Sequence, residues 1–150
     1  ITVNKKISNF FIKKYFHPEL QIKLTNHLLK FANTSIDISD GLIGDLEKMI
    51  NRQNFSFLIK ENKIPISLNL KKLISKKKLK KINTVTNGDD YQILFTASLN
   101  KSRIIKRISK KLGIKITKIG KIISGKKKSS IIDVKGKQIK AINNAYKHEF

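Results

Sequence analysis

The chain has 150 residues, and its 33 Lys and Arg against 10 Asp and Glu give a formal net charge of +23 at pH 7. Its length and its 39% hydrophobic content suit one globular domain rather than two. The absence of cysteine excludes disulfides, thiolate metal sites and a cysteine nucleophile. No apolar run approaches the roughly 20 residues of a membrane span, and the first residues lack a secretory signal pattern. We therefore expect a single domain over residues 1–150, located in the cytoplasm.

The large positive charge admits two interpretations. A nucleic-acid-binding module would gather lysines on one face, with exposed aromatic residues between them. Only Arg52, Arg103 and Arg107 are arginines, although Arg is the favoured residue for bidentate contacts to phosphate and guanine. Ile, Asn and Lys are all abundant, so a general compositional bias also explains the charge as a solvated surface. The charge by itself therefore leaves nucleic-acid binding as an alternative function.

The first 54 residues predict two helices separated by an acidic turn. Residues 1–18 give no clear pattern, although Pro18 is suited to the first turn of a helix. Spacings of four and three predict an amphipathic helix from Leu20, Leu24, Leu28 and Phe31. After the turn, helical spacing predicts a second helix that ends near Gln53 and buries Leu42, Leu46, Met49 and Ile50.

The remaining residues alternate between predicted strands and helices. Residues 55–59 predict a strand, and residues 68–79 predict a helix with one apolar face. Residues 91–97 predict a central strand, and Asn100 is placed to cap a helix over 101–112 that Gly113 ends. Residues 114–123 predict a strand, and residues 130–134 and 138–142 a hairpin. We predict the α+β class, with a mixed β-sheet of four to six strands and helices mainly on one face.

The acidic turn is Ser35-Ile36-Asp37-Ile38-Ser39-Asp40-Gly41-Leu42. One interpretation is structural, because Asp40 or Ser39 can cap the following helix by accepting from its first N–H groups. The other is a site for metal and phosphate, because paired carboxylates hold hard cations and a helix N-terminus favours phosphate oxygens. Six of the 10 acids lie in this turn and helix or at Asp89 and Asp90, which favours cation binding.

Two ordered motifs in this chain resemble a known family. The first is the Ser35–Leu42 turn, in which residues 36–42 are similar to the pattern I-D-[IL]-S-D-G-L. The second is Gly88-Asp89-Asp90-Tyr91-Gln92-Ile93-Leu94-Phe95-Thr96, similar to G-G-[DE]-D-Y-E-L-[LC]-F-T. Both patterns belong to the C-terminal domain of thiamine-monophosphate kinase, in the aminoimidazole ribonucleotide synthetase-like superfamily. Asn87 replaces the first Gly of the second pattern, and Gln92 replaces its Glu.

The resemblance implies Mg²⁺-dependent transfer of the ATP γ-phosphate to thiamine monophosphate, which gives thiamine diphosphate and ADP. Asp37 and Asp40 match Mg²⁺ ligands, Ser39 matches an ATP contact, and Asp89 matches a substrate contact. Tyr146, near the C-terminus, resembles an aromatic residue that contacts thiamine, but it also suits a merely structural role. The resemblance implies no catalytic nucleophile, which agrees with a reaction that depends on positioning and electrostatics.

The same resemblance implies partners outside this chain. The family's N-terminal domain, with nucleotide-binding and homodimer contacts, is absent here, so we expect the chain alone to be inactive. The alternatives are another ATP-using member of the superfamily, a half that keeps the fold without activity, and the basic nucleic-acid-binding module. The second motif argues against the first alternative, and we expect neither a membrane nor a nucleic-acid partner.

Overall fold

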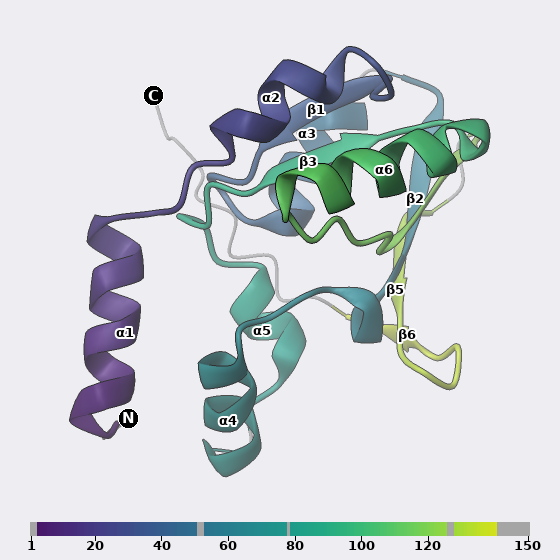
Figure 1. The fold of residues 1–150 in the computed structure, drawn as a ribbon. Coiled ribbons are helices and arrows are strands. Elements are labelled where there is room, and N and C mark those ends of the chain that lie inside the picture. The colour runs from purple at the N-terminus through teal and green to yellow at the C-terminus, as the bar shows by residue number, and fades with distance from the viewer. Residues whose placement is uncertain (1–2, 51–52, 78, 126–127, 141–150) are drawn as a thin grey trace, which may run out of the picture.

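The computed structural model describes residues 3–50, 53–77, 79–125 and 128–140 (Figure 1). The helices are α1 (Lys5–Phe16), α2 (Ile22–Leu28), α3 (Leu42–Ile50), α4 (Leu68–Lys77), α5 (Lys81–Val85) and α6 (Ser102–Leu112), with short 3₁₀ turns η1 (Glu61–Lys63) and η2 (Leu99–Lys101). The strands are β1 (Thr34–Asp37), β2 (Phe55–Lys60), β3 (Ile93–Thr96), β4 (Gly120–Ser124), β5 (Ser130–Ile132) and β6 (Gln138–Ile139). None of the helices in these ranges has the length and apolar character needed to cross a membrane.

A mixed four-stranded sheet has the order β4-β2-β5-β6. Strand β2 pairs antiparallel with β4 and parallel with β5, so Ile59 lies opposite both Gly120 and Ile131. Strands β5 and β6 form an antiparallel hairpin. The predicted α+β class with a mixed sheet is confirmed, as are the strand over residues 55–59 and the terminal hairpin.

Strands β1 and β3 form a separate antiparallel ribbon, in which Thr34 faces Thr96 and Asp37 faces Ile93. The strand predicted over residues 91–97 is confirmed at Ile93–Thr96, but its predicted central position is wrong, since β3 pairs only with β1 in the described part of the chain. The ribbon joins segments about 60 residues apart, and no local pattern in the sequence encodes such a pairing.

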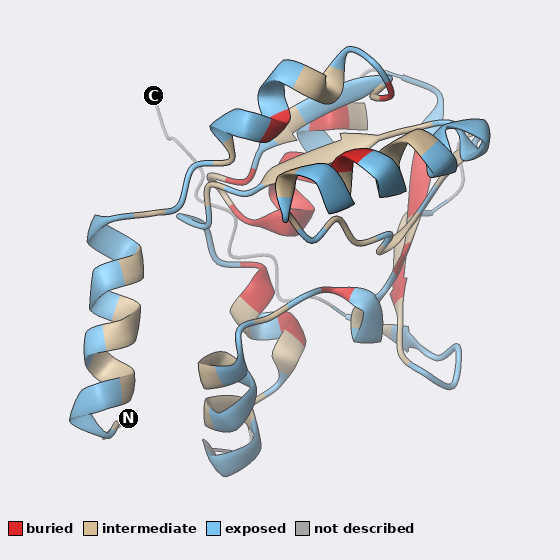
Figure 2. Cartoon of the chain, viewed as in Figure 1, coloured by how far each residue is buried: buried red, intermediate tan, exposed pale blue. Residues whose placement is uncertain are grey.

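Two hydrophobic clusters pack against opposite faces of this ribbon. Ile38 and Leu94 lie in or against a cluster that includes α3, α5 and the four-stranded sheet. Ile93 and Phe95 pack against a second cluster, whose buried members are Leu24, Phe31 and Ile108 from α2, α6 and the segment after α2. This alternation follows from the period of two along a strand. Figure 2 shows many of the buried residues on α3, whose apolar side chains share the first cluster with residues of the ribbon and of the four-stranded sheet.

Several helix predictions need correction at their N-terminal ends. Helix α2 begins at Ile22, so Pro18 precedes its first turn. Asn100 lies in η2, and α6 begins after Lys101 without a side-chain cap, so the predicted Asn100 cap is wrong. The predicted end of α6 is confirmed, because Gly113 adopts a left-handed φ of 66°.

Two other segments also differ from the prediction. Strand β4 begins only at Gly120, so the predicted strand over residues 114–123 is too long. Helix α5, which contributes buried Ile82 and Val85, was not predicted because its five residues are too few to display a helical period.

Candidate functional site

The two acidic motifs meet at one end of the ribbon. Beyond the last strand pair, the N–H of Ile38 donates to the carbonyl oxygen of Gln92 at 2.9 Å, and the N–H of Tyr91 donates to that of Ile38 at 2.8 Å. The N–H of Asp89 then donates to the carbonyl oxygen of Ser39 at 2.9 Å. The backbone therefore joins the Asp37–Asp40 turn to the Gly88–Tyr91 turn.

Two glycines permit this close approach. A Cβ atom on Gly41 would lie 2.1 Å from the carbonyl oxygen of Thr86, and Gly41 also has a φ of +103°. A Cβ atom on Gly88 would lie 2.0 Å from the carbonyl oxygen of Ser39. Both distances are far inside van der Waals contact with backbone atoms. Each motif therefore contributes a glycine that lets the other motif's backbone pack against it.

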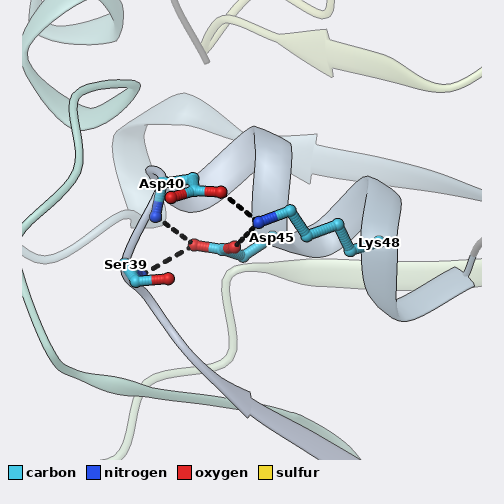
Figure 3. A network of polar contacts seen from close by, with 4 residues as sticks. All are labelled: Ser39, Asp40, Asp45 and Lys48. Atoms are coloured by element: carbon cyan, nitrogen blue, oxygen red, sulfur yellow. Dashed lines mark hydrogen bonds and ion pairs between the residues drawn. The ribbon is translucent and has the colours of Figure 1, made fainter. Parts of the chain in front are cut away.

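The Ser39–Asp40 turn is held by a buried carboxylate on α3 (Figure 3). Asp45 has no exposed surface, and its Oδ2 accepts from the N–H groups of Ser39 and Asp40, each at 2.9 Å. Its Oδ1 accepts from Nζ of Lys48 at 3.2 Å, and Lys48 also forms an ion pair with Asp40. The hydrogen bond to Asp40, and secondly that to Asp45, raises the pKa of Lys48.

These contacts reverse the predicted capping arrangement. Asp40 uses its carboxylate to bind Lys48, and the described part of the chain shows no bond from it or from the Ser39 hydroxyl to the first N–H groups of α3. Instead, a residue within the first turn of the helix reaches back to the segment before it. The sequence does carry a signal for this role of Asp45, which is an acid on the apolar face of the helix. Asp45 lies three residues after Leu42 and four before Met49.

The second turn carries an unusual backbone. Asp89 and Tyr91 both have positive φ, at 67° and 49°, and such values are uncommon outside glycine. The Tyr91 hydroxyl donates to Oδ1 of Asp89 at 3.2 Å, and this bond raises the pKa of Tyr91. Although Asp90 as a residue is exposed, desolvation of its carboxyl group raises its pKa, and the charge of Asp89 adds to the rise.

The structure thus brings four of the five predicted site residues into one region. Asp37 is exposed at the end of β1, Ser39 and Asp40 are half-buried in the turn, and Asp89 hydrogen-bonds to the backbone of Ser39. Tyr146 lies outside the described residues. Sequence reasoning missed the contribution of Asp45 and Lys48, which contact the predicted residues directly.

The oxygen donors in the turn fit Mg²⁺ by their chemistry. The carboxylates of Asp37 and Asp40 are hard ligands of the kind that Mg²⁺ prefers, and the exposed Asp37 side chain is open to solvent. Among the described residues, no three His, Cys, Asp or Glu side chains gather closely enough to hold a metal ion. These residues therefore fit one part of a Mg²⁺ site, whose other ligands would be water, phosphate oxygens or groups outside the described residues.

Comparison with known proteins places this geometry in context. No protein-family profile matches the chain. The thiamine-monophosphate kinase of Buchnera aphidicola subsp. Acyrthosiphon pisum is 39% identical over 121 residues, which are 79% of this chain and 36% of that protein. The crystal structure of thiamine-monophosphate kinase from Stenotrophomonas maltophilia shares the fold, with a TM-score of 0.75, 24% identity, and coverage of 87% of this chain and 41% of that one.

A third relative is AaThiL complexed with AMPPCP and TMP, with a TM-score of 0.71 and 26% identity over 93% of this chain and 41% of that one. The fold and the site together define an α+β domain in which two acidic turns are joined at the end of a ribbon. The sequence and structure relatives show that the chain is homologous to part of thiamine-monophosphate kinase. It spans little more than a third of the length of the Buchnera relative.

Proposed function

We propose that the chain supplies the acidic-turn portion of the active site in a thiamine-monophosphate kinase. The reaction is transfer of the ATP γ-phosphate to thiamine monophosphate, giving thiamine diphosphate and ADP. The observation that carries the proposal is the junction of the two turns, where Asp89 N–H bonds to the carbonyl of Ser39. A nucleotide at the first turn and an acceptor at the second would then be neighbours, as direct transfer requires.

Each of the described side chains has a role that its position supports. Asp37 and Asp40 would hold Mg²⁺, which supplies charge neutralisation to two phosphates that otherwise repel each other. Ser39, between them, would contact ATP. Asp89, on the adjoining turn, suits the cationic thiazolium ring of thiamine, and Tyr146 remains a proposed stacking partner for that ring. A solved relative complexed with AMPPCP and TMP supports both an ATP site and an acceptor site.

The proposal extends to parts of the enzyme outside this chain. An N-terminal domain would supply further metal ligands, the remaining nucleotide contacts and a homodimer interface, and the enzyme would act in the cytoplasm. The basic surface would then be a solvated surface rather than a nucleic-acid interface, and it would steer anionic substrates toward the site.

Substitution of the two candidate metal ligands tests the proposal. In the enzyme assembled with its N-terminal domain, Asp37→Asn or Asp40→Asn should lower kcat by roughly 100-fold, because electrostatic stabilisation of the transferring group is lost. Thermal unfolding should change little for the exposed Asp37. Asp133→Asn is a matched control, since Asp133 is an acid in the remote β5–β6 turn. Turnover like that of the unchanged enzyme in both site variants would rule out the assignment.

A further inference from the structure

We propose that Asp45 is a positioning residue that sets the conformation of the Ser39–Asp40 turn for its ligand. The inference deepens the proposed function and rests on it for the identity of that ligand. The geometric part stands by itself, because it depends on hydrogen bonds between described residues. No part of it requires Asp45 to touch substrate or metal.

The contacts of Asp45 are directed at this turn. The side chain is completely buried, and both backbone N–H groups that Oδ2 accepts belong to residues that carry candidate ligand groups. Two bonds of 2.9 Å to consecutive amides orient the two peptide groups on either side of the Ser39 α-carbon. They therefore restrict the directions in which the Ser39 and Asp40 side chains leave the backbone.

Stabilisation of the helix end alone does not explain this arrangement. In an ordinary capping box, an acid in the first turn bonds the N–H of the capping residue itself. Here the first carbonyl to accept a helical bond is that of Gly41, from the N–H of Asp45 at 3.0 Å. The Asp45 carboxylate passes beyond Gly41 to the two residues before it. A buried carboxylate is costly unless it is fully paired, and this one is paired mainly with the turn.

Lys48 is the partner of Asp40 that a bound cation could replace. Its side chain is 53% exposed and bonds both Asp40 and Asp45, whereas Asp45 is closed to solvent. A cation that approached Asp40 would compete with the Lys48 ammonium group for the same carboxylate. The two bonds from Asp45 to the backbone amides would persist through that exchange. Asp45 would thus keep the turn in shape while Asp40 changes its partner.

The test measures the turn and its ligand separately in the full 150-residue chain. Amide hydrogen exchange at Ser39 and Asp40, normalised to the amides of β2, reports the two hydrogen bonds. Mn²⁺ alone, added as a paramagnetic probe, reports ligand binding through the concentration that half-broadens the Asp37 and Asp40 amide signals. For Asp45→Ala we expect the exchange rates of both amides to rise roughly tenfold. We also expect the Mn²⁺ concentration needed for half-broadening to rise roughly tenfold or more.

Asp45→Asn separates position from charge, because its amide oxygen can still accept from both N–H groups. We expect its amide exchange rates, and the Mn²⁺ concentration needed for half-broadening, to stay within about threefold of the values for the unchanged chain. This arm decides the question even if Asp45→Ala does not fold. A tenfold loss of Mn²⁺ binding in Asp45→Asn, with exchange unchanged, would assign the effect to charge and overturn the inference.

Asp133→Ala is the matched control, since Oδ1 of Asp133 also accepts from two backbone amides, those of Lys135 at 2.8 Å and Lys137 at 2.9 Å. It should leave both readouts at the Ser39–Asp40 turn unchanged. If Asp45→Ala behaves like this control while the unchanged chain binds Mn²⁺, the inference fails and the proposed function survives. If the unchanged chain does not respond to Mn²⁺, the proposed metal site fails, and with it the ligand-positioning role of Asp45.

Discussion

Two glycines allow the two acidic turns to touch, and they do so through two different effects, the space left by the missing Cβ atom and the backbone φ. Gly41 combines a left-handed φ with a close backbone neighbour, whereas Gly88 has the close neighbour without the unusual φ. Gly113, which ends α6, has the opposite combination, a φ of +66° with no atom within 4 Å of an added Cβ. The three positions thus separate steric exclusion from backbone strain.

We predict that Gly88→Ala lowers the free energy of unfolding by more than about 2 kcal/mol, because a backbone carbonyl cannot move aside for the new Cβ. Gly113→Ala should cost only about 1 kcal/mol, the price of a left-handed φ in a residue with a side chain. Urea unfolding of both variants measures the difference. Equal costs would show that the backbone around Gly88 can shift to admit a Cβ atom, and would contradict the prediction.

Asp90 provides a prediction of pH dependence. Its pKa in the fold lies above the ordinary value of 3.8, because desolvation and the charge of Asp89 disfavour ionisation. A group with a raised pKa stabilises the fold when protonated, so its contribution is present below pH 3.8 and is lost as the pH rises through the raised value. Above the raised pKa, where Asp90 is ionised in the fold, its charge therefore lowers stability.

Asp90→Asn should accordingly raise Tm at pH 7 by at most about 2 °C, the size expected for a change near 0.5 kcal/mol at an exposed position. The difference should disappear at pH 3, where Asp90 in the unchanged chain is mostly protonated. Thermal unfolding at the two pH values checks both statements. A lower Tm at pH 7 would mean that the Asp90 charge makes a stabilising contact.

The sequence could predict the residues of the candidate site, but not all of the contacts that hold them. Asp37, Ser39, Asp40 and Asp89 stand in two recognisable patterns, and the structure places them in one region. The contacts of Asp45 were not predicted, although its position on an apolar helix face was visible. They depend on the path by which residues 38–41 fold back over the start of α3, and no spacing along the sequence encodes that path.

Among the larger elements, the β1–β3 ribbon holds the site in place because it is packed on both faces. Phe31 supports the face away from α3: it is 2% exposed, and its ring lies 5.0 Å from that of Phe95 on β3, centroid to centroid. Leu29, two residues earlier, is 99% exposed. These neighbours offer a matched pair of apolar residues with opposite burial.

We predict that Phe31→Ala lowers the free energy of unfolding by about 3–5 kcal/mol, through lost burial and the cavity left beneath the ribbon. Leu29→Ala should change it by less than about 0.5 kcal/mol. Denaturant unfolding of both variants measures the contrast. If Phe31→Ala were as mild as Leu29→Ala, the second cluster would contribute little to the ribbon's stability.

Elements with local signals were predicted well, and elements that depend on distant pairing were not. Strand β2, the β5–β6 hairpin and the end of α6 are marked by β-branched runs, turn residues and a terminal glycine. The β1–β3 ribbon is separate from the four-stranded sheet, although apolar side chains of both share one cluster with α3. Residues 114–119 alternate in the sequence, but they precede the strand. Ile114 and Ile116 pack against the second cluster and Ile119 against the first.

Across the whole molecule, the main functional question is which other protein segments the chain requires for activity. It spans 36% of the Buchnera relative's length. Large apolar side chains are exposed on and just after α1, with exposed fractions of 51% for Ile12, 62% for Tyr15, 68% for Phe16, 59% for Leu20 and 65% for Ile22. We expect the proposed N-terminal domain to cover apolar surface of this kind.

We predict that residues 1–150 alone do not turn over ATP and thiamine monophosphate, because they lack a loop suited to bind the triphosphate. The seven glycines of the chain are dispersed, and the one Gly-x-x-x-x-Gly-Lys spacing, Gly120–Lys126, is followed by Lys127 where a phosphate-binding loop has Ser or Thr. The first five residues of this segment also form strand β4 rather than a loop that could cradle a triphosphate. The test is ATP-dependent formation of thiamine diphosphate by the chain alone, by the N-terminal portion of the Buchnera relative alone, and by both together. Activity should require both, and it should fall roughly 100-fold when the chain carries Asp37→Asn. Multi-turnover activity from the lone chain would mean that these 150 residues contain a complete site.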